Sequence, residues 1–410
     1  MNSEEKEDLI RKIVNGEVAI HQIEKFAEPN DAVEVRRRSL EIITKSTLEN
    51  IGSSKMDYSA IRGKNAENVI GAISVPVGVV GPIKVKGGSF DGSVYVPMAT
   101  TEGALIASIG RGIKAINLSG GAVARVIDDG MTRGPVFKFD SIVDAHRFVK
   151  WLHENFPKIK AVAEATTHHG KLERITHYIT GNNVFLRLRY KTGDAMGMNM
   201  ATVATEAACT YMEKNFKGAT LVGVSGNMCS DKKPSMVNML EGRGKTVIAE
   251  IVVKGKVLKD VFGADAATIN DINFRKNWAG SIRAGSATHL NAHFANMVAA
   301  IFLATGQDIA QVVESSSGYT WTELRGRDLY ISVTMPSLEI GTKGGGTGLP
   351  TQNESLSIMK LNGSGEPLGS NSMKLAEVIA SIVMAGELNL LSALATRDLG
   401  KAHQKLGRSK

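Results

Sequence analysis

The sequence predicts an α+β fold, because the spacing of its apolar residues changes along the chain. Residues 1 to about 50 carry apolar side chains at helical spacing among many charges, which predicts a small helical N-terminal unit. Residues 69–97 are rich in β-branched residues punctuated by glycine and proline, a pattern typical of strands and turns. Residues 122–192 alternate short β-rich segments with a helix near 142–155, which favours antiparallel pairing.

The first long helix after these strands is predicted to begin at Thr100 or Thr101, because either hydroxyl can cap a helix N-terminus. The glycine pair at 120–121 should end it. The elements expected after residue 192 are an apolar helix opened by DAMGMNM (194–200) and reaching Phe216, a buried strand at 219–224, a strand near 246–253, a long apolar helix from about 287 to 305, a strand at 329–335 and a C-terminal helix through 379–399.

Composition is that of an ordinary globular protein. The chain has 410 residues, of which 43% are hydrophobic and 22% charged, enough for two or three domains. Its start is polar, and no run approaches the roughly 18 apolar residues that a membrane helix needs, so we expect neither a signal peptide nor a membrane anchor. The two cysteines, Cys209 and Cys229, lack a metal-ligand or redox spacing, which favours a cytoplasmic protein.

The charge balance favours anionic partners. The formal net charge is +8 and the sequence pI is about 9.3. Nucleic acid is the general interpretation of such a balance, but aromatic residues make up only 5% of the chain and no basic stripe with interleaved aromatics is present. A polyanionic small molecule suits the scattered lysines and arginines at least as well, and no nucleic-acid partner is expected.

One stretch, SGNMCSDKKPSMVNMLEGRG (225–244), stands out because two adjacent lysines precede a proline. Pro234 disfavours helical geometry at Lys233, so both lysines are expected on an extended turn that leads into a helix. Successive side chains of an extended segment point in opposite directions. One ammonium group could then face a reacting oxygen while the other holds a carboxylate. An ordinary solvated charge run remains the alternative.

Three further ionisable residues have two interpretations each. Glu102 is expected in the first turn of an apolar helix, where the helix dipole favours an anion, and simple capping is the alternative. Asp308 closes a long apolar helix, where an anion is disfavoured, so it should find a cation or take up a proton. His403 lies in the basic tail KAHQKLGRSK and could be a solvated histidine.

Each of these sequence features alone is weak evidence for a function, but together they point to one protein family. Nine strings follow one another in an order that resembles class I 3-hydroxy-3-methylglutaryl-coenzyme A (HMG-CoA) reductase from about residue 60 to the end. The strings are ENVIG (67–71), PMATTEGALIAS (97–108), DGMTRGP (129–135), DAMGMNM (194–200), SGNMCSDKKP (225–234), NAHFAN (291–296), GQD (306–308), GTKGGGT (341–347) and the near-terminal His403.

The resemblance implies a reaction and a role for four residues. The reaction is an NADPH-dependent four-electron reduction of HMG-CoA to mevalonate and free coenzyme A, with two hydride transfers via mevaldyl-CoA and mevaldehyde. Lys232 matches the lysine that stabilises the developing oxyanion, and Glu102 matches the acid that delivers a proton to the aldehyde oxygen. Asp308 matches the carboxylate that couples these two. His403 matches the histidine that protonates the coenzyme A thiolate from a mobile C-terminal flap.

The same resemblance implies the substrate contacts. A guanidinium fork and two ammonium groups suit an acyl group derived from a dicarboxylate. The residue before Arg111, Gly110, departs from the asparagine of the animal enzymes and leaves contacts to the adenine end open. The implied substrate-binding residues are Arg133, Ser225, Asn227, Asp231, Lys233, Lys276, Asn296, Arg111 and Ser108.

For the domains, the resemblance implies a helical N-terminal domain (1–66) and a large α/β HMG-CoA-binding domain with a long central helix (67–133 and 224–410). A ferredoxin-like cofactor domain (134–223) is expected to be inserted between the two segments of the large domain. The insert lacks Gly-x-Gly-x-x-Gly, which disfavours a doubly wound fold. A pyrophosphate is expected at the N-terminus of the helix that DAMGMNM opens. The implied cofactor-binding residues are Asp194, Ala195, Met196, Gly197, Met198, Asn199, Lys171 and Arg408.

NADPH is preferred to NADH because the stretch THHGKLERI (167–175) is basic enough to hold a 2′-phosphate. The family also assembles its sites between subunits, so we expect a homodimer or homotetramer with active sites at the dimer interface, without metal or membrane. Two other functions remain open. A coenzyme A thioesterase would need an activated nucleophile, for which no arrangement is evident. An acyl-coenzyme A sensor would bind without turnover.

Overall fold

The computed structural model describes residues 1–53, 65, 68 and 72–397. Its N-terminal unit is helical, as predicted, and packs around a small core of its own that includes Leu9, Ile13 and Val35. The first helix begins with a capping box, in which the Asn2 side chain and Glu5 bond to each other's backbone N–H groups. The elements are α1 (Ser3–Val14), a 3-10 helix η1 (Ile20–Lys25), α2 (Pro29–Thr44) and α3 (Glu49–Ser53).

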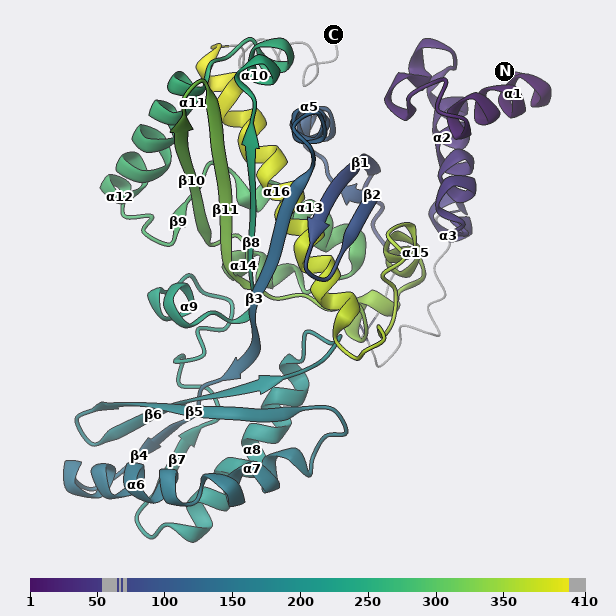
Figure 1. The fold of residues 1–410 in the computed structure, drawn as a ribbon. Coiled ribbons are helices and arrows are strands. Elements are labelled where there is room, and N and C mark those ends of the chain that lie inside the picture. Colours follow the sequence, from purple (N-terminus) through teal and green to yellow (C-terminus); the bar gives the residue numbers. More distant parts are fainter. Residues whose placement is uncertain (54–64, 66–67, 69–71, 398–410) are drawn as a thin grey trace.

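The larger body in the upper part of Figure 1 is built on a mixed sheet that confirms the α+β prediction. Its strands lie in the order β3, β8, β11, β10 and β9, with the β1–β2 hairpin joined to β3. The strand bounds are β1 (Val77–Gly87), β2 (Asp91–Ala99), β3 (Ala122–Arg133), β8 (Gly244–Val253), β9 (His289–Leu290), β10 (Gly318–Arg325) and β11 (Asp328–Leu338).

The helices of this body cover the sheet and its edges (Figure 1). They are α5 (Leu105–Leu118), α9 (Met236–Glu241), α10 (Gly255–Phe262), α11 (Ala266–Ile272), the π-helix η2 (Asn273–Gly280), α12 (Ser281–Ala284), α13 (Phe294–Thr305), η3 (Ile309–Gln311), α14 (Val312–Ser315), η4 (Gly345–Gly348), α15 (Pro350–Ile358) and α16 (Ser370–Ala395).

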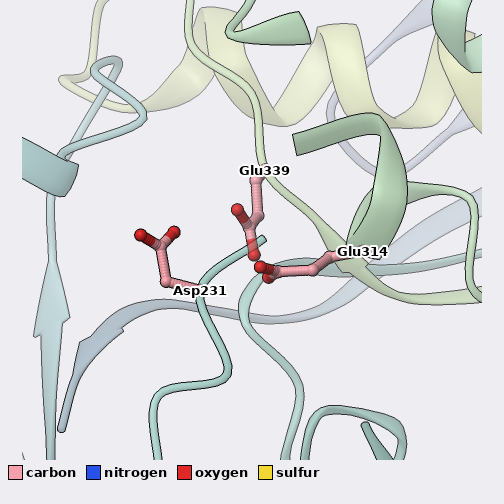
Figure 2. Close-up of side chains that lie close together, drawn as sticks. All are labelled: Asp231, Glu314 and Glu339. Carbon is pink, nitrogen blue, oxygen red and sulfur yellow. The ribbon is translucent and has the colours of Figure 1, made fainter. Parts of the chain in front are cut away.

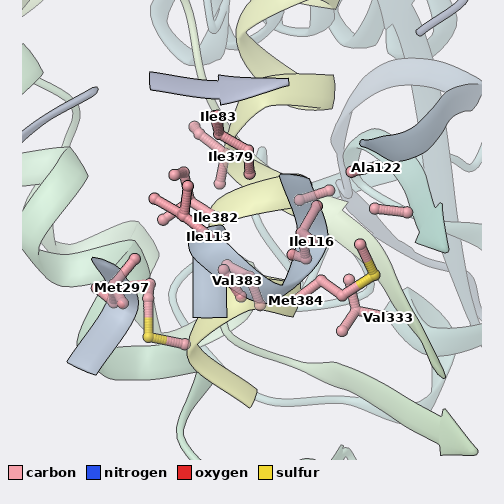
Figure 3. Close-up of a cluster of buried hydrophobic side chains, with 14 of the residues drawn as sticks. Ile83, Ile113, Ile116, Ala122, Met297, Val333, Ile379, Ile382, Val383 and Met384 are labelled. Carbon is pink, nitrogen blue, oxygen red and sulfur yellow. The ribbon is translucent and has the colours of Figure 1, made fainter. Parts of the chain in front are cut away.

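Helix α16 runs through the middle of this body and supplies much of its core. Figure 3 shows Ile379, Ile382 and Val383 of α16 against side chains of α5, α13 and the sheet. Length and composition alone would let α16 cross a membrane, so the expectation that no such run exists was wrong. The most apolar window of α16 is 83% buried inside the protein, however, which is typical of a core helix.

The lower body in Figure 1 comprises residues between β3 and the lysine-rich stretch, with a separate core around Phe137, Phe148 and Leu186. Its strands form an antiparallel sheet in the order β7, β4, β6, β5. Strand β3 runs between the two bodies and pairs with β8 at one end and with β6 at the other. The elements are β4 (Val136–Lys138), α6 (Ile142–Glu154), α7 (Phe156–Glu164), β5 (Lys171–Thr180), β6 (Asn183–Lys191), α8 (Met198–Asn215) and β7 (Thr220–Gly223).

Three predicted elements differ from the structure. Helix α5 begins at Leu105, after Ala104 in a left-handed conformation, so Thr100 and Thr101 do not cap it and Glu102 lies in the preceding loop. The predicted helix from 287 is shorter, because β9 occupies its first turn and α13 begins only at residue 294. Strand β7 is half-exposed, not buried, since β4 is its only neighbour among the described strands.

Candidate active site

The turn between β7 and α9, residues 224–235, carries the lysine pair, and we call it the lysine loop. Lys232 has a φ of 60°, so its backbone is left-handed and not extended as predicted. Its ammonium nitrogen lies 3.0 Å from a carboxylate oxygen of Asp308, whereas the Lys233 ammonium donates to the backbone oxygen of Asp231 at 3.0 Å. The two ammonium groups therefore have different partners, and that of Lys232 lies beside a carboxylate.

Asp308 is positioned by the end of α13. The helix stops at Gly306, and the Asp308 side chain caps the next short helix, η3, by accepting from the N–H of Ala310 at 3.1 Å. Its other oxygen pairs with Lys232. Of the two outcomes expected for this carboxylate, the structure has the pairing with a cation. The pair is partly open to solvent, with 44% of Lys232 and 35% of Asp308 exposed.

A buried charge network lies behind the lysine loop. The Arg243 guanidinium contacts three carboxylates, with Asp231 at 3.1 Å, Glu314 at 2.8 Å and Glu339 at 2.6 Å. Figure 2 shows these carboxylates close together. They are near enough to one another to hold a metal ion, but Arg243 already supplies a cation to all three. The arrangement therefore serves as a structural ion network.

The same network sets the protonation of its members. Burial opposes the charge of Arg243, but Glu339, Glu314 and Asp231 outweigh it and raise the pKa of Arg243. Burial raises the pKa of Glu339 well above its usual range, with Glu314 adding to the effect and Arg243 opposing it. Burial also opposes ionisation of Asp231, but Arg243 and the hydrogen bond from Gln311 hold its pKa below the usual range. Asp231 is thus a fixed anion at neutral pH.

A second buried arginine holds the other side of the lysine loop. Arg187 lies in β6 of the lower body, and its guanidinium donates to the backbone oxygen of Met228 at 2.7 Å and to that of Gly242 at 2.6 Å. It also donates to the side chain of Asn238 in α9 at 3.1 Å. These acceptors flank the lysine pair on both sides in the sequence, so Arg187 ties the loop and α9 to the lower sheet.

Glu102 lies at the opposite end of α13 from the lysine pair. Its carboxylate accepts a hydrogen bond at 3.2 Å from Asn296, in the first turn of α13. Asp308, the partner of Lys232, lies just past the last turn of that helix. At 1.5 Å per residue, the nine steps from Asn296 to Thr305 span about 14 Å along the axis. One chain therefore does not bring Glu102 and Lys232 together.

The expected substrate contacts fall into two groups. Near the lysine loop, Arg133 ends β3 with its guanidinium 3.7 Å from Asp231, Asn227 has a left-handed φ of 62°, and the Ser225 hydroxyl lies 3.8 Å from the Cys229 sulfur. In a different region, Glu102 and Arg111 line a cavity of about 1470 Å³ between α2, β1 and α5. Ser108 is also on α5, Asn296 contacts Glu102, and Lys276 is exposed on η2.

The DAMGMNM segment lies where the two bodies meet. The buried carboxylate of Asp194 accepts from the N–H groups of Gly365, Gly369 and Ser372, at 2.8, 2.8 and 2.9 Å, and so caps the N-terminus of α16. The backbone of Ala195 and Met196 packs against Gly341. Gly197, with a φ of 90°, precedes α8, whose first turn (Met198, Asn199) has no side-chain cap.

Among the remaining expected residues, Lys171 directly follows Gly170, which packs against Met200 of DAMGMNM. The Lys171 ammonium group pairs with Glu164 at 3.3 Å. His403, Arg408 and most of the ENVIG string lie outside the described residues.

Sequence reasoning missed the buried residues behind the lysine loop: Arg187, Arg243, Gln311, Glu314 and Glu339. Two of these residues, Arg187 and Glu314, could have been noticed from the sequence. Arg187 interrupts an apolar strand, VFLRLRY, and Glu314 follows an apolar pair in QVVESSS. A charge within an apolar run needs a buried partner, and that partner comes from a distant part of the chain.

The sequence matches known proteins of one family over nearly the whole chain. The family model described as Hydroxymethylglutaryl-coenzyme A reductase matches residues 32–408. Among proteins named 3-hydroxy-3-methylglutaryl-coenzyme A reductase, that of Aeropyrum pernix is 53% identical over 98% of this chain and 96% of its own. Those of Haloferax volcanii and Pyrococcus abyssi are 48% and 47% identical, each over 98% of this chain and over 98% and 99% of their own.

A solved structure of the class II enzyme from Streptococcus pneumoniae, bound to NADPH, has the same fold, with a TM-score of 0.70 and 18% identity over 92% of this chain and 100% of that one. The model match and the archaeal relatives, with the lysine loop and its partners in place, show that this chain is an enzyme of the hydroxymethylglutaryl-coenzyme A reductase family.

Proposed function

We propose that the protein reduces HMG-CoA to mevalonate and free coenzyme A in two hydride transfers, with mevaldyl-CoA and mevaldehyde between them, and with NADPH as the reductant. The observation that carries the proposal is the Lys232–Asp308 pair on a loop backed by buried charges. An ammonium group fixed in this way can stabilise the oxyanion that forms at each reduction. Asp308 keeps the Lys232 ammonium group oriented.

The acyl group of the substrate is proposed to bind at the lysine loop. Its free carboxylate would meet Lys233 and Arg133, which lie beside Asp231. Asp231 is anchored from behind by Arg243, so it orients the cationic groups around it. Lys276, Ser225, Asn227 and Asn296 are proposed to complete the substrate contacts. Arg111 and Ser108, on α5 by the large cavity, are proposed for coenzyme A.

The residues at the start of α8 fit a dinucleotide. The first N–H groups of an α-helix have no partner within the helix, and Gly197 offers no side chain to cap them. The cofactor, when bound, would supply the hydride from its nicotinamide ring, and Ala195, Met196, Gly197, Met198 and Asn199 would hold its pyrophosphate.

Lys171 and Arg408 are proposed for the 2′-phosphate of NADPH. Lys171 already pairs with Glu164, so a phosphate would have to compete with that carboxylate. The lower body is proposed to be a ferredoxin-like cofactor domain of residues 134–223, since its elements follow the order β4, α6, α7, β5, β6, α8, β7.

Two copies of the chain are proposed to share each active site. Glu102 and Lys232 lie at opposite ends of α13, yet the proposed chemistry needs the acid and the oxyanion partner on one substrate. A second protomer that presents its Glu102 to the lysine loop of the first would complete the site. We infer a homodimer or a homotetramer of such pairs, in the cytoplasm, with His403 closing the site as the thiolate acid.

The test is loss of NADPH absorbance when purified protein meets HMG-CoA, with NADH measured in parallel. Two NADPH consumed per thiol released, abolished in Lys232→Ala, is the expected result. Thiol release without NADPH would indicate a thioesterase, and binding without oxidation would indicate a sensor. Faster oxidation of NADH would overturn the cofactor assignment.

A further inference from the structure

Glu314, in α14, lies behind the lysine loop and has no role in the steps proposed above. Its side chain is almost fully buried, and one carboxylate oxygen accepts a hydrogen bond from the backbone N–H of Lys232. The other oxygen accepts from Arg243 at 2.8 Å and from Asn238 at 3.4 Å. Glu314 thus joins the backbone of Lys232 to the buried ion network.

The hydrogen bond between Glu314 and Lys232 lies at a residue whose backbone conformation is strained. A left-handed backbone is unfavourable for a non-glycine residue, so the φ of 60° at Lys232 needs a compensating interaction. A hydrogen bond to an ionised carboxylate is about twice as strong as a neutral one. The backbone conformation of Lys232 decides where its side chain leaves the loop, and therefore whether the ammonium group reaches Asp308.

Asn238 extends this support to the lower body. Its side-chain oxygen accepts from Arg187, and its amide nitrogen donates to Glu314. Arg187 also binds the backbone on both sides of the lysine pair, at Met228 and Gly242. A continuous set of hydrogen bonds therefore runs from β6 through α9 to the N–H of Lys232.

We propose that Glu314 is a positioning residue for the reduction: it fixes the backbone of Lys232 so that the ammonium group stays beside Asp308, and Arg187 anchors the same loop to the lower sheet. The inference rests on the proposed role of Lys232. It assigns no contact with substrate to Glu314, and it predicts that the rate of the reduction depends on this side chain more than substrate affinity does.

The chain offers a matched control in Glu339. This carboxylate is as buried as that of Glu314 and binds the same nitrogen of Arg243, at 2.6 Å, but it accepts no hydrogen bond from the lysine loop. Burial favours its neutral form, and a glutamine has nearly the same shape. The Glu339 side chain also interacts with that of Glu314, and the amide NH₂ of a glutamine can donate to Glu314 as the neutral carboxyl group does. Glu339→Gln therefore perturbs the buried network but leaves the hydrogen bond between Glu314 and the backbone N–H of Lys232 in place.

The main variant is Glu314→Gln. One amide oxygen cannot accept from both Arg243 and the N–H of Lys232, so the amide NH₂ must face one of these donors. We expect kcat to fall by about tenfold to a hundredfold, because displacements near 1 Å at a reacting group have effects of that size. KM for HMG-CoA and for NADPH should stay within about threefold. Glu339→Gln should keep kcat within about twofold.

Folding is followed by circular dichroism and thermal unfolding of each variant. If Glu314→Gln does not fold, Arg187→Lys carries the test. Two different guanidinium nitrogens of Arg187 bind its three acceptors, and the single nitrogen of a lysine cannot take both positions, so kcat should again fall with KM retained. An unchanged kcat in the folded variants, or an equal fall in Glu339→Gln, overturns the inference. Failure of the wild-type protein to oxidise NADPH would instead refute the proposed function.

Discussion

Mixing two inactive variants gives the sharpest test of the proposed shared site. Glu102→Gln removes the proton donor, and Lys232→Ala removes the cation that stabilises the oxyanion. Each change alone should lower kcat by a hundredfold or more, on the order seen for loss of one oxyanion partner. Glu102 contacts the first turn of α13 and Lys232 pairs with Asp308 just past its last turn; the helix rises about 14 Å from Asn296 to Thr305, so the two residues do not meet within one chain.

The expected recovery follows from this geometry. In a dimer with one variant of each kind, one site combines both substitutions and the other combines neither. Random pairing at equal concentrations makes half of the dimers mixed, so about one quarter of all sites are intact. The specific activity per protomer should therefore rise to about 25% of the wild-type value, and to about 50% in purified mixed dimers.

The assay uses two affinity tags, so that mixed dimers are isolated from coexpressed variants before NADPH oxidation is measured. Lys232→Ala mixed with Asp308→Asn is the matched control. Those two residues pair within one chain at 3.0 Å, so every site in that mixture stays incomplete and no recovery is expected. Mixed Glu102 and Lys232 dimers without activity would refute the shared site, as would equal recovery in the control.

Three other predictions concern single positions. Asp308→Asn should lower kcat at least tenfold but cost under about 1 kcal/mol in urea unfolding, because a pair as exposed as this one contributes little to stability. Gly112→Ala should lower the free energy of unfolding by about 1–3 kcal/mol, since the added methyl group would overlap the backbone of α16. Gly110→Ala, on the same helix, meets open space and should leave the free energy of unfolding unchanged or raise it. Burial and a 2.5 Å hydrogen bond to Glu241 raise the pKa of Tyr178 to about 12. A raised folded pKa gives stability that is present below about pH 10 and lost towards pH 12, so Tyr178→Phe should flatten the fall of unfolding free energy with pH over that range. Equal slopes in the two proteins would contradict this last prediction.

The fold was predictable where local pattern and tertiary packing agree. The spacing of apolar residues gave the helical N-terminal unit, α6 and the strands β8 and β11, all close to their observed bounds. It failed at Thr100 and Thr101, where good capping residues are present but the chain turns through a left-handed Ala104 before α5 begins. A turn of that kind depends on what the loop packs against, and no local pattern reports it.

The residues of the candidate site that have a local sequence signal were predictable, and their buried partners were not. From its place after an apolar helix, Asp308 was expected either to find a cation or to take up a proton, and the structure pairs it with Lys232. The buried support was not predictable, since Glu314 and Arg243 are 71 residues apart in the chain and Asn238 and Arg187 are 51 apart. Their partnership is a property of tertiary packing, in which distant elements place opposite charges together.

The Asp194 cap on α16 has a consequence for folding during synthesis on the ribosome. The carboxylate and the helix start that it caps are up to 178 residues apart, and Asp194 leaves the ribosome long before α16 does. The lower body can therefore be complete, with its carboxylate in place, when the central helix is still being synthesised. Trimming the chain between β3 and β7, or permuting it so that α16 emerges first, would leave the N–H groups of Gly369 and Ser372 at the start of that helix, and that of Gly365 in the loop before it, without their acceptor during assembly.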